Sequence, residues 1–424
     1  MSPGLSRWLP WVAAVLSLAL QGADWTRFRG PDATGVSPDR DTPAQWSATE
    51  GVLWKTALPG AGGSSPITLG DKVFITCYSG FGLDPDEPGE QKGLKHHVVC
   101  IHRADGHIVW DKSRQASLPE TDYRGFVTLH GYASATPATD GKAVYAFFGR
   151  SGVVAYDLTG ELLWHASVGD RLHAQGWGSA ASPIVWQRLV VVNASIESDS
   201  LVALDATSGK EVWRVGGIAR SWSTPLVVSL PDGREELVVS LEGKVLGLDP
   251  ETGKEIWRCD GIPDYVVPSV IAHQGIVYVT AGRRGMTLAI RAGGKGDVTK
   301  THLLWKLAKS PKVGTPLYSK DHLFWIGHQG VAVCVQADTG KVVYEERLDV
   351  RGRGDKVYSS LVAADGKLYG VTREDGTFIL DASPQFRQPT QSRLGDQGVF
   401  NATPVIADGR LLLRSDRYLY CIGK

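Results

Sequence analysis

One repeated phrase runs along nearly the whole chain and limits the folds that it can adopt. Each copy has an apolar run that starts at a proline, a polar turn, two runs of β-branched residues, and a small-residue turn that leads into tryptophan. The clearest examples of the last turn are residues 203–213 and 247–257. A repeat of just over forty residues, made only of short strands, predicts blades arranged in a ring.

The prolines give the register of the repeats. Successive copies lie 42 to 48 residues apart, except for a gap of 71 across the first copy, which carries insertions at residues 81–94 and 113–128. Leu361 takes the place of proline in the seventh copy, and the eighth copy ends after three strands. The prolines are Pro66, Pro137, Pro183, Pro225, Pro268, Pro316 and Pro404.

The segment around Trp54 matches the fourth strand that the last copy lacks. We therefore expect an all-β fold, an eight-bladed β-propeller of four-stranded antiparallel blades, whose ring is closed when this N-terminal strand completes the C-terminal blade. An aromatic residue recurs at one position of the predicted fourth strands, and a side chain repeated in this way is expected to pack between blades rather than to bind a ligand. These residues are Trp54, Trp110, Trp164, Trp213, Trp257, Trp305 and Tyr344.

The N-terminus carries a candidate export signal. Arg7 precedes an apolar stretch of 13 residues, 8–20, which is shorter than the ~20 residues of a membrane span and matches the core of a signal peptide. No cysteine follows it, so the lipoprotein signal is missing. We expect a signal peptide (1–23), an extension (24–45) and a propeller (46–424), in an exported, soluble periplasmic or extracellular protein. An uncleaved anchor is the alternative.

Charge and cysteine content exclude some classes of function. The chain has 45 basic and 45 acidic residues, so no positive excess is available to neutralise nucleic-acid phosphates. The five cysteines include no C-x-x-C-H haem motif, and most occupy positions held by small apolar residues in other repeats. Whether Cys77 and Cys100, on neighbouring strands, form a disulfide stays open. We expect a monomer.

The pattern Ala-x-Asp-x-x-Thr-Gly-x-x-x-Trp resembles the repeat of the pyrroloquinoline-quinone (PQQ) β-propellers, over about residues 46–424. The leader Trp25-Thr-Arg-Phe-Arg-Gly-Pro31 with Gly35 is similar to the start of exported PQQ-repeat proteins. The family includes quinoprotein alcohol dehydrogenases and a non-enzymatic branch, the scaffold lipoprotein of outer-membrane barrel assembly. The resemblance thus implies the fold, and both branches share it.

For a dehydrogenase, the resemblance implies PQQ in the central funnel with Ca²⁺ held by Glu, Asn and Asp, an Asp base, a Trp floor and a vicinal disulfide. The segments before each proline should open onto this funnel. Only Asp264 in them is acidic, and no Cys-Cys pair occurs in the chain. This incomplete set argues against a standard PQQ dehydrogenase, and Asp264 is the one weak candidate for a catalytic residue.

The same segments are rich in aromatic, cationic and amide side chains. Such groups suit an anionic or sugar-like ligand through stacking and charge-assisted hydrogen bonds, although they could equally line a wet channel. The candidate ligand-binding residues are His130, Tyr132, His173, Gln175, Trp177, Arg220, Trp222, Asp264, Tyr265, Lys312, Lys356, Tyr358 and Asn401.

No metal site is predicted. Residues 83–90 cluster four carboxylates without the spacing of a calcium loop. His96, His97, His102 and His107 fall on one strand and its turn, where alternation separates the first two.

Two functions remain. We favour an exported binding or interaction scaffold that presents the funnel and the loops 81–94 and 113–128 to a protein, carbohydrate or other polymer. The alternative is a divergent PQQ-dependent dehydrogenase of alcohols or sugars, a quinoprotein oxidoreductase with PQQ and Ca²⁺ in the funnel.

Overall fold

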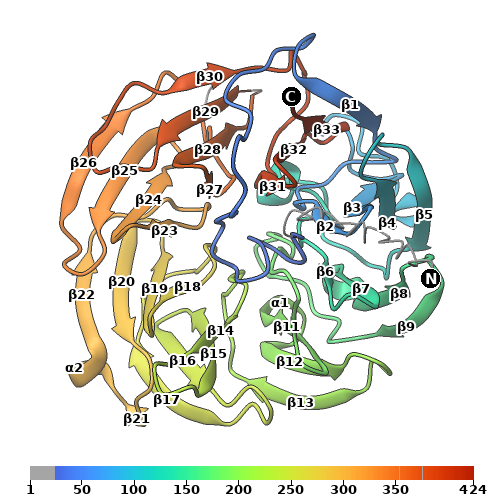
Figure 1. Ribbon diagram of the computed structural model, residues 1–424. Helices are drawn as coiled ribbons and strands as arrows, with labels where there is room; N and C mark the ends of the chain where they lie inside the picture. Colours follow the sequence, from blue (N-terminus) through green and yellow to red (C-terminus); the bar gives the residue numbers. More distant parts are fainter. Residues whose placement is uncertain (1–23, 353, 375) are drawn as a thin grey trace, which may run out of the picture.

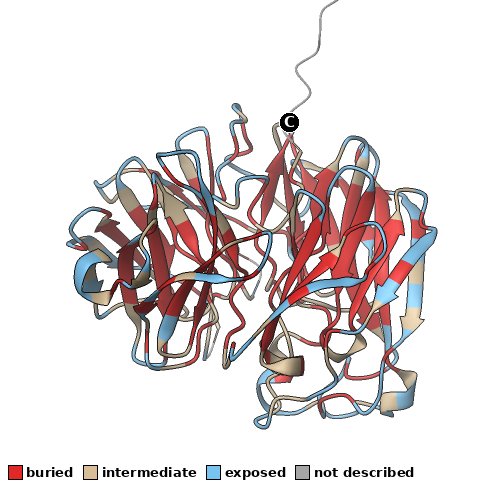
Figure 2. Cartoon of the chain, turned by 90° about the horizontal axis from the view of Figure 1, so that it is seen from below, coloured by how far each residue is buried: buried red, intermediate tan, exposed pale blue. Residues whose placement is uncertain are grey.

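The computed structural model describes residues 24–424 except 353 and 375. Eight sheets, antiparallel apart from one short parallel pair in the fourth, surround a common axis like the blades of a wheel (Figure 1), which confirms the predicted eight-bladed β-propeller. The expected signal peptide lies outside the described residues. Figure 2 shows that buried residues follow the strands, while exposed residues concentrate in the loops.

The first three blades follow the chain in order, each with its strands hydrogen-bonded in sequence. The first contains β2 (Ile67–Leu69), β3 (Lys72–Ser79), β4 (Lys95–His102) and β5 (Ile108–Gln115). The second contains β6 (Ala138–Thr139), β7 (Ala143–Phe147), β8 (Val153–Asp157) and β9 (Leu162–Ala166). The third contains β10 (Ile184–Trp186), β11 (Leu189–Ala194), β12 (Ser200–Asp205) and β13 (Glu211–Gly216).

The fourth blade has a fifth strand. It contains β14 (Leu226–Ser229), β15 (Glu235–Leu241), β16 (Lys244–Leu248), β17 (Glu255–Asp260) and β21 (Gly296–Asp297), which pairs with β17 in parallel. Strand β21 comes from the connection inside the fifth blade, whose own strands are β18 (Ile271–His273), β19 (Ile276–Ala281), β20 (Met286–Arg291) and β22 (Leu303–Leu307). The fourth blade therefore has its outer edge covered by the chain itself.

The remaining blades bring the chain back to its start. The sixth contains β23 (Leu317–Ser319), β24 (His322–Ile326), β25 (Val331–Gln336) and β26 (Val342–Arg347). The seventh contains β27 (Val362–Ala364), β28 (Lys367–Thr372), β29 (Gly376–Asp381) and β30 (Thr390–Ser392). The eighth contains β31 (Val405–Ala407), β32 (Arg410–Arg414), β33 (Tyr418–Ile422) and β1 (Val52–Ala57).

Strand β1 supplies the outer strand of the eighth blade. It pairs antiparallel with β33, with Trp54 opposite Cys421. The two ends of the propeller thus share one sheet, as the match between the Trp54 segment and the other fourth strands predicts.

Helices contribute little to the described part of the chain. The helical segments have three to five residues each: α1 (Ser195–Ser198), α2 (Thr299–His302), η1 (Gln91–Gly93), η2 (Gly125–Leu129) and η3 (Gly149–Ser151). Among the described residues, no helix has the length and apolar character that crossing a membrane requires.

The recurring tryptophans reach from one blade to the next. Trp54, Trp110, Trp164, Trp213 and Trp305 each donate their indole N–H to a backbone carbonyl in the turn of the following blade, at 2.9–3.2 Å. A glycine of that turn lies against each ring, so close that a Cβ atom at Gly209 would stand 2.6 Å from Trp164. The Gly and the Trp of the Thr-Gly-x-x-x-Trp pattern therefore make contacts between neighbouring blades rather than within one blade.

The other two members of the series behave differently. Trp257 donates to the Glu236 carboxylate of its own blade, and Tyr344 packs edge-on against Phe386 with ring centroids 5.3 Å apart. Trp257 lies where β21 pairs with β17 instead of under a neighbouring glycine turn. All five cysteines are buried and free. Cys77 lies opposite His97 and Cys100 opposite Phe74, so the open question of a Cys77–Cys100 disulfide is answered: the two are unpaired.

Candidate functional site

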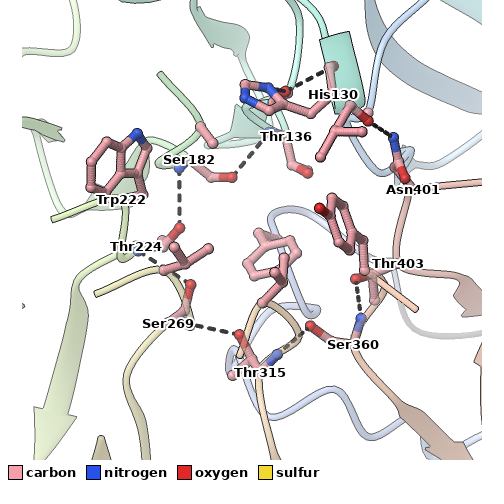
Figure 3. Close-up of a pocket in the computed structure, with 18 of the residues that line it drawn as sticks. His130, Thr136, Ser182, Trp222, Thr224, Ser269, Thr315, Ser360, Asn401 and Thr403 are labelled. Atoms are coloured by element: carbon pink, nitrogen blue, oxygen red, sulfur yellow. Dashed lines mark hydrogen bonds between the residues drawn. The ribbon is translucent and has the colours of Figure 1, made fainter. Parts of the chain in front are cut away.

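A cavity of about 200 Å³ occupies the centre of the wheel. Residues from all eight blades line it, together with Phe28 from the N-terminal extension. Its innermost layer is a belt of one Ser or Thr from each blade, and Figure 3 labels all of these residues except Ser65. These residues, the hydroxyl belt, are Ser65, Thr136, Ser182, Thr224, Ser269, Thr315, Ser360 and Thr403.

The hydroxyl belt is a closed circle of hydrogen bonds. Each member's backbone N–H donates to the side-chain oxygen of the member in the next blade, at 2.9–3.2 Å. The circle is completed where Thr403 N–H donates to Ser65 Oγ, across the junction of the last and first blades. The Ser or Thr hydroxyl just before the innermost strand of each blade therefore links that blade to its neighbour. Each such hydrogen bond stabilises the fold by about 1 kcal/mol.

The belt corrects the expected register of the fifth copy. Pro268 was expected to begin this copy, in line with Pro225 and Pro316. The belt hydroxyl is instead Ser269, and Val270 stands where the other copies have proline. The fifth blade therefore begins two residues later than the proline pattern predicts, because the hydroxyl rather than the proline makes the contact between blades.

The hydroxyl protons of the belt remain available. Each belt oxygen accepts a peptide N–H, and within residues 24–424, apart from 353 and 375, none of the eight hydroxyls donates to a protein acceptor. A hydroxyl can donate one hydrogen bond while it accepts another. The cavity is therefore surrounded by donors that water or a ligand can use.

The N-terminal extension crosses the ring on one side of the belt (Figure 1). The Trp25 N–H donates to Thr68 Oγ1 at the first blade, and Trp25 O accepts the backbone N–H of Thr68. At the seventh blade, Ser37 N–H donates to Ala363 O. Between them, the fully buried Arg29 donates to the carbonyl of Pro316 at 2.9 Å. The contacted residues in each blade come just after the belt residue in the sequence. Phe28 and the extension therefore lie at one end of the cavity, and the segments that come before the belt residues lie at the other end.

Aromatic rings form a wall on the other side of the belt. Trp177 lies 5.1 Å from Trp222 and 5.0 Å from Tyr265 between ring centroids, and Phe126 contacts it edge-on at 5.1 Å. Trp222 Nε1 donates to Gly178 O at 2.7 Å, which fixes the indole. This arrangement offers ring faces and edges to a ligand with an apolar face.

One carboxylate lines the cavity, and it is already paired. The Asp355 carboxylate lies 3.3 Å from Lys312 Nζ and 3.7 Å from His328 Nε2, and it accepts the Tyr358 hydroxyl at 3.2 Å. Arg373 stacks over Tyr358 at 4.7 Å and donates to the Asn401 side chain at 2.9 Å. Among the lining residues Lys312 and Asp355 balance each other, and Arg373 reaches the cavity only through its contacts with Tyr358 and Asn401.

His130 anchors the wall in its neutral form. Its Nε2 lies 2.8 Å from Trp177 O, and its Nδ1 lies 2.7 Å from Ser134 Oγ. Burial lowers the pKa of His130, with a smaller opposing effect from its bond to the Trp177 carbonyl. Burial likewise lowers the pKa of His328. The imidazoles near the cavity therefore act as hydrogen-bonding groups at neutral pH.

The structure brings together about half of the residues that the sequence singles out. Those that line the cavity are His130, Trp177, Trp222, Tyr265, Lys312, Tyr358 and Asn401. The hydroxyl belt, Phe28, Phe126, Leu129 and Asp355 line it as well and were missed. The belt could have been found, because a Ser or Thr precedes nearly every repeat proline.

The other candidates have structural partners elsewhere. Arg220 pairs with Glu242 at 2.6 Å, and Lys356 Nζ donates to Val350 O at 2.9 Å. The Asp264 carboxylate accepts the backbone N–H groups of Tyr265 and Arg283, so it stabilises a turn. Tyr132, His173 and Gln175 are also absent from the cavity lining: Tyr132 donates to Thr121 O, and His173 packs against Trp177 and Trp222 from behind.

The lining does not fit a calcium-bound PQQ. Ca²⁺ takes six to eight oxygen ligands with several carboxylates among them, whereas the cavity offers Asp355 alone, held by Lys312. Asp264, the expected candidate for a base, does not line the cavity. The five cysteines are free and dispersed over separate strands, so a vicinal disulfide is missing too.

Fold and cavity together define the class: an eight-bladed propeller with an axial pocket closed at one end by its own N-terminal extension. The chain belongs to the PQQ-repeat family, because the family profile described as outer membrane protein assembly factor BamB matches residues 32–199, 197–296 and 296–383. No curated protein sequence matches the chain.

Solved structures share the fold. BamB from Moraxella catarrhalis superposes with a TM-score of 0.62 at 15% identity, covering 88% of this chain and 97% of that one. A europium-containing methanol dehydrogenase gives 0.63 at 12% identity, covering 95% and 98%. The quinohemoprotein alcohol dehydrogenase ADHIIG from Pseudomonas putida HK5 gives 0.63 at 12%, covering 94% and 80%. At such identities the likeness concerns the fold alone.

Proposed function

We propose that the protein is an exported binding propeller that holds a small, sugar-like ligand in its axial pocket and presents its first-blade loops to a partner. The observation that carries this proposal is the pairing of an aromatic wall with a circle of free hydroxyl donors. A sugar has an apolar ring face for Trp177, Trp222 and Tyr265 and oxygen acceptors for the belt. Lys312 in the lining, with Arg373 next to Tyr358 and Asn401, favours a sugar that bears a carboxylate.

The size of the cavity supports a single-ring ligand. A volume of about 200 Å³ lies below the range usual for sites of larger ligands. A monosaccharide fits this space better than an extended tricyclic cofactor does.

The loops of the first blade supply the second part of the proposal. Residues 113–128 include Phe126, which lines the pocket while 47% of it is exposed, and residues 81–94 include the exposed Leu83. A loop that borders the pocket can couple ligand occupancy to partner binding. The family description, an outer membrane protein assembly factor, favours a protein partner over a polymer.

Tryptophan fluorescence tests the pocket directly. We expect titration with a uronic acid such as glucuronate to change the emission of the purified protein, and the change to be lost in Trp222→Ala. Trp186→Phe is the matched control, because Trp186 lies outside the cavity and bonds Glu235 at 2.9 Å. No response to uronic acids or neutral sugars would refute the proposal, and so would reduction of a redox dye by alcohols after addition of PQQ and Ca²⁺.

A further inference from the structure

The turn between β4 and β5 differs chemically from the same turn in other blades. In the third blade its key positions hold Asp205, Ser208 and Lys210, and in the fourth they hold Asp249, Thr252 and Lys254. The first blade has His102, Asp105 and His107 there. The backbone is unchanged: His102 N–H donates to His107 O, as Asp205 N–H donates to Lys210 O, both at 2.8 Å.

The three side chains converge on one point. Asp105 Oδ1 accepts hydrogen bonds from His102 Nδ1 at 2.9 Å and from His107 Nδ1 at 2.7 Å. The two imidazole centroids are 4.9 Å apart, and one potential ligand atom from each residue lies within 4.8 Å of the others. The neighbouring histidines are not involved, since His96 stacks on Phe148 and His97 bonds Asp111.

The backbone of this turn packs against strand β1. Gly106, with φ of +79°, lies against Trp54, where an added Cβ would stand 2.6 Å from the ring. Trp54 Nε1 donates to Arg103 O at 3.0 Å, and Thr56 Oγ1 donates to Gly106 O at 2.5 Å. Both Trp54 and Thr56 belong to β1, so the turn is clamped by the strand that joins the last blade to the first. A rigid backbone is what a preorganised ligand set needs.

We propose that His102, Asp105 and His107 form a binding site for a divalent transition-metal ion, with Zn²⁺ as the best match. Two imidazoles and one carboxylate are ligands that Zn²⁺ accepts in tetrahedral sites, with water in the fourth position. Ca²⁺ and Mg²⁺ prefer oxygen ligands and are disfavoured here. The side chains of His102, Asp105 and His107 are 31%, 59% and 60% exposed, which leaves the open position accessible to water.

The site has a structural consequence. The metal would cross-link the two ends of a turn on which β1 rests. Any ligand that binds only the folded state raises its apparent stability. Zn²⁺ binding should therefore stabilise the junction between the first and last blades, independently of the axial pocket.

Isothermal titration of the tag-free, chelator-treated protein with ZnCl₂ tests this inference. We expect one site, at least tenfold weaker in His107→Lys and Asp105→Ser, which install the residues of the third blade and so preserve the fold. His322→Gln, at a half-buried histidine on β24, should bind Zn²⁺ like the wild type. CaCl₂ and MgCl₂ should give no saturable heat.

A second readout separates binding at this turn from binding elsewhere. Zn²⁺ should raise the melting temperature of the wild type and of His322→Gln and leave that of His107→Lys unchanged. The inference is overturned if the wild type gives no saturable heat, or if His107→Lys and Asp105→Ser titrate and melt with Zn²⁺ as the wild type does.

Discussion

Replacing Arg29 by alanine should both destabilise the protein and open the closed end of the axial pocket. Arg29 is 1% exposed and donates to Thr34 O at 2.8 Å and to Pro316 O at 2.9 Å, with longer bonds to three further carbonyls. Burial lowers its pKa to about 9, so the guanidinium stays charged at neutral pH. A buried acceptor without a donor costs about 1–3 kcal/mol, and the two short bonds alone amount to about 4 kcal/mol.

That loss translates into a modest thermal shift. With an unfolding entropy of about 2.1 cal/mol/K per residue over roughly 400 residues, about 4 kcal/mol lowers the melting temperature by about 5 °C. The extension can also detach before the ring unfolds, since local segments open at lower cost than the whole fold. Limited proteolysis should then cut Arg29→Ala within residues 24–45 before any other site.

The matched control is Arg27→Ala. Arg27 Nε donates to Pro31 O at 2.8 Å, within the extension itself, so this variant should melt within about 1 °C of the wild type. The reasoning fails if Arg29→Ala melts like Arg27→Ala and its extension is no more sensitive to protease.

Three further predictions concern the ring and a buried acid. Ser65→Ala leaves Thr403 N–H without its acceptor and should cost about 1–3 kcal/mol in urea unfolding; an unchanged midpoint would show that the belt closes without this bond. Burial raises the pKa of Glu197 from 4.5 to about 7, so the folded state binds more protons than the unfolded state, and the free energy of unfolding should fall as the pH rises from 4.5 to 7. In melting curves recorded over this pH range, Glu197→Gln should reduce the dependence of stability on pH. An unchanged dependence would show that another group causes it. In Gly209→Ala the new Cβ would stand 2.6 Å from an indole at φ of +69°, whereas in Gly233→Ala it would meet open space at φ of +83°. Calorimetry should show a loss of unfolding free energy of about 3 kcal/mol for the first variant and about 1 kcal/mol for the second. Equal losses would contradict the inter-blade packing.

The sequence predicts the ring because its signals are local and repeated. Strand, turn and tryptophan recur at a nearly constant spacing, and in most copies the tryptophan makes the same contact with the next blade. The error at Pro268 shows the limit of this reasoning. In most copies the proline simply follows the belt residue, whose hydroxyl makes the contact between blades. In the fifth copy the proline stands before the belt residue instead, and Ser269 still makes this contact.

The pocket is less accessible to such reasoning because its composition depends on distant segments. Phe28 comes from outside the repeats, and nothing in its own neighbourhood predicts that it closes the axis. Residues near the funnel in sequence can turn away, as Arg220 does to pair with Glu242. Asp355 precedes the belt by several residues and enters the pocket through its contact with Lys312.

The most direct test is a crystal structure of the protein soaked with glucuronate. Our account predicts density for one sugar ring inside the cavity, stacked on Trp177 or Trp222 and within hydrogen-bond distance of belt hydroxyls. An empty cavity with sugar bound on the outer loops, or a planar tricyclic quinone carried from the host into the same space, would contradict it.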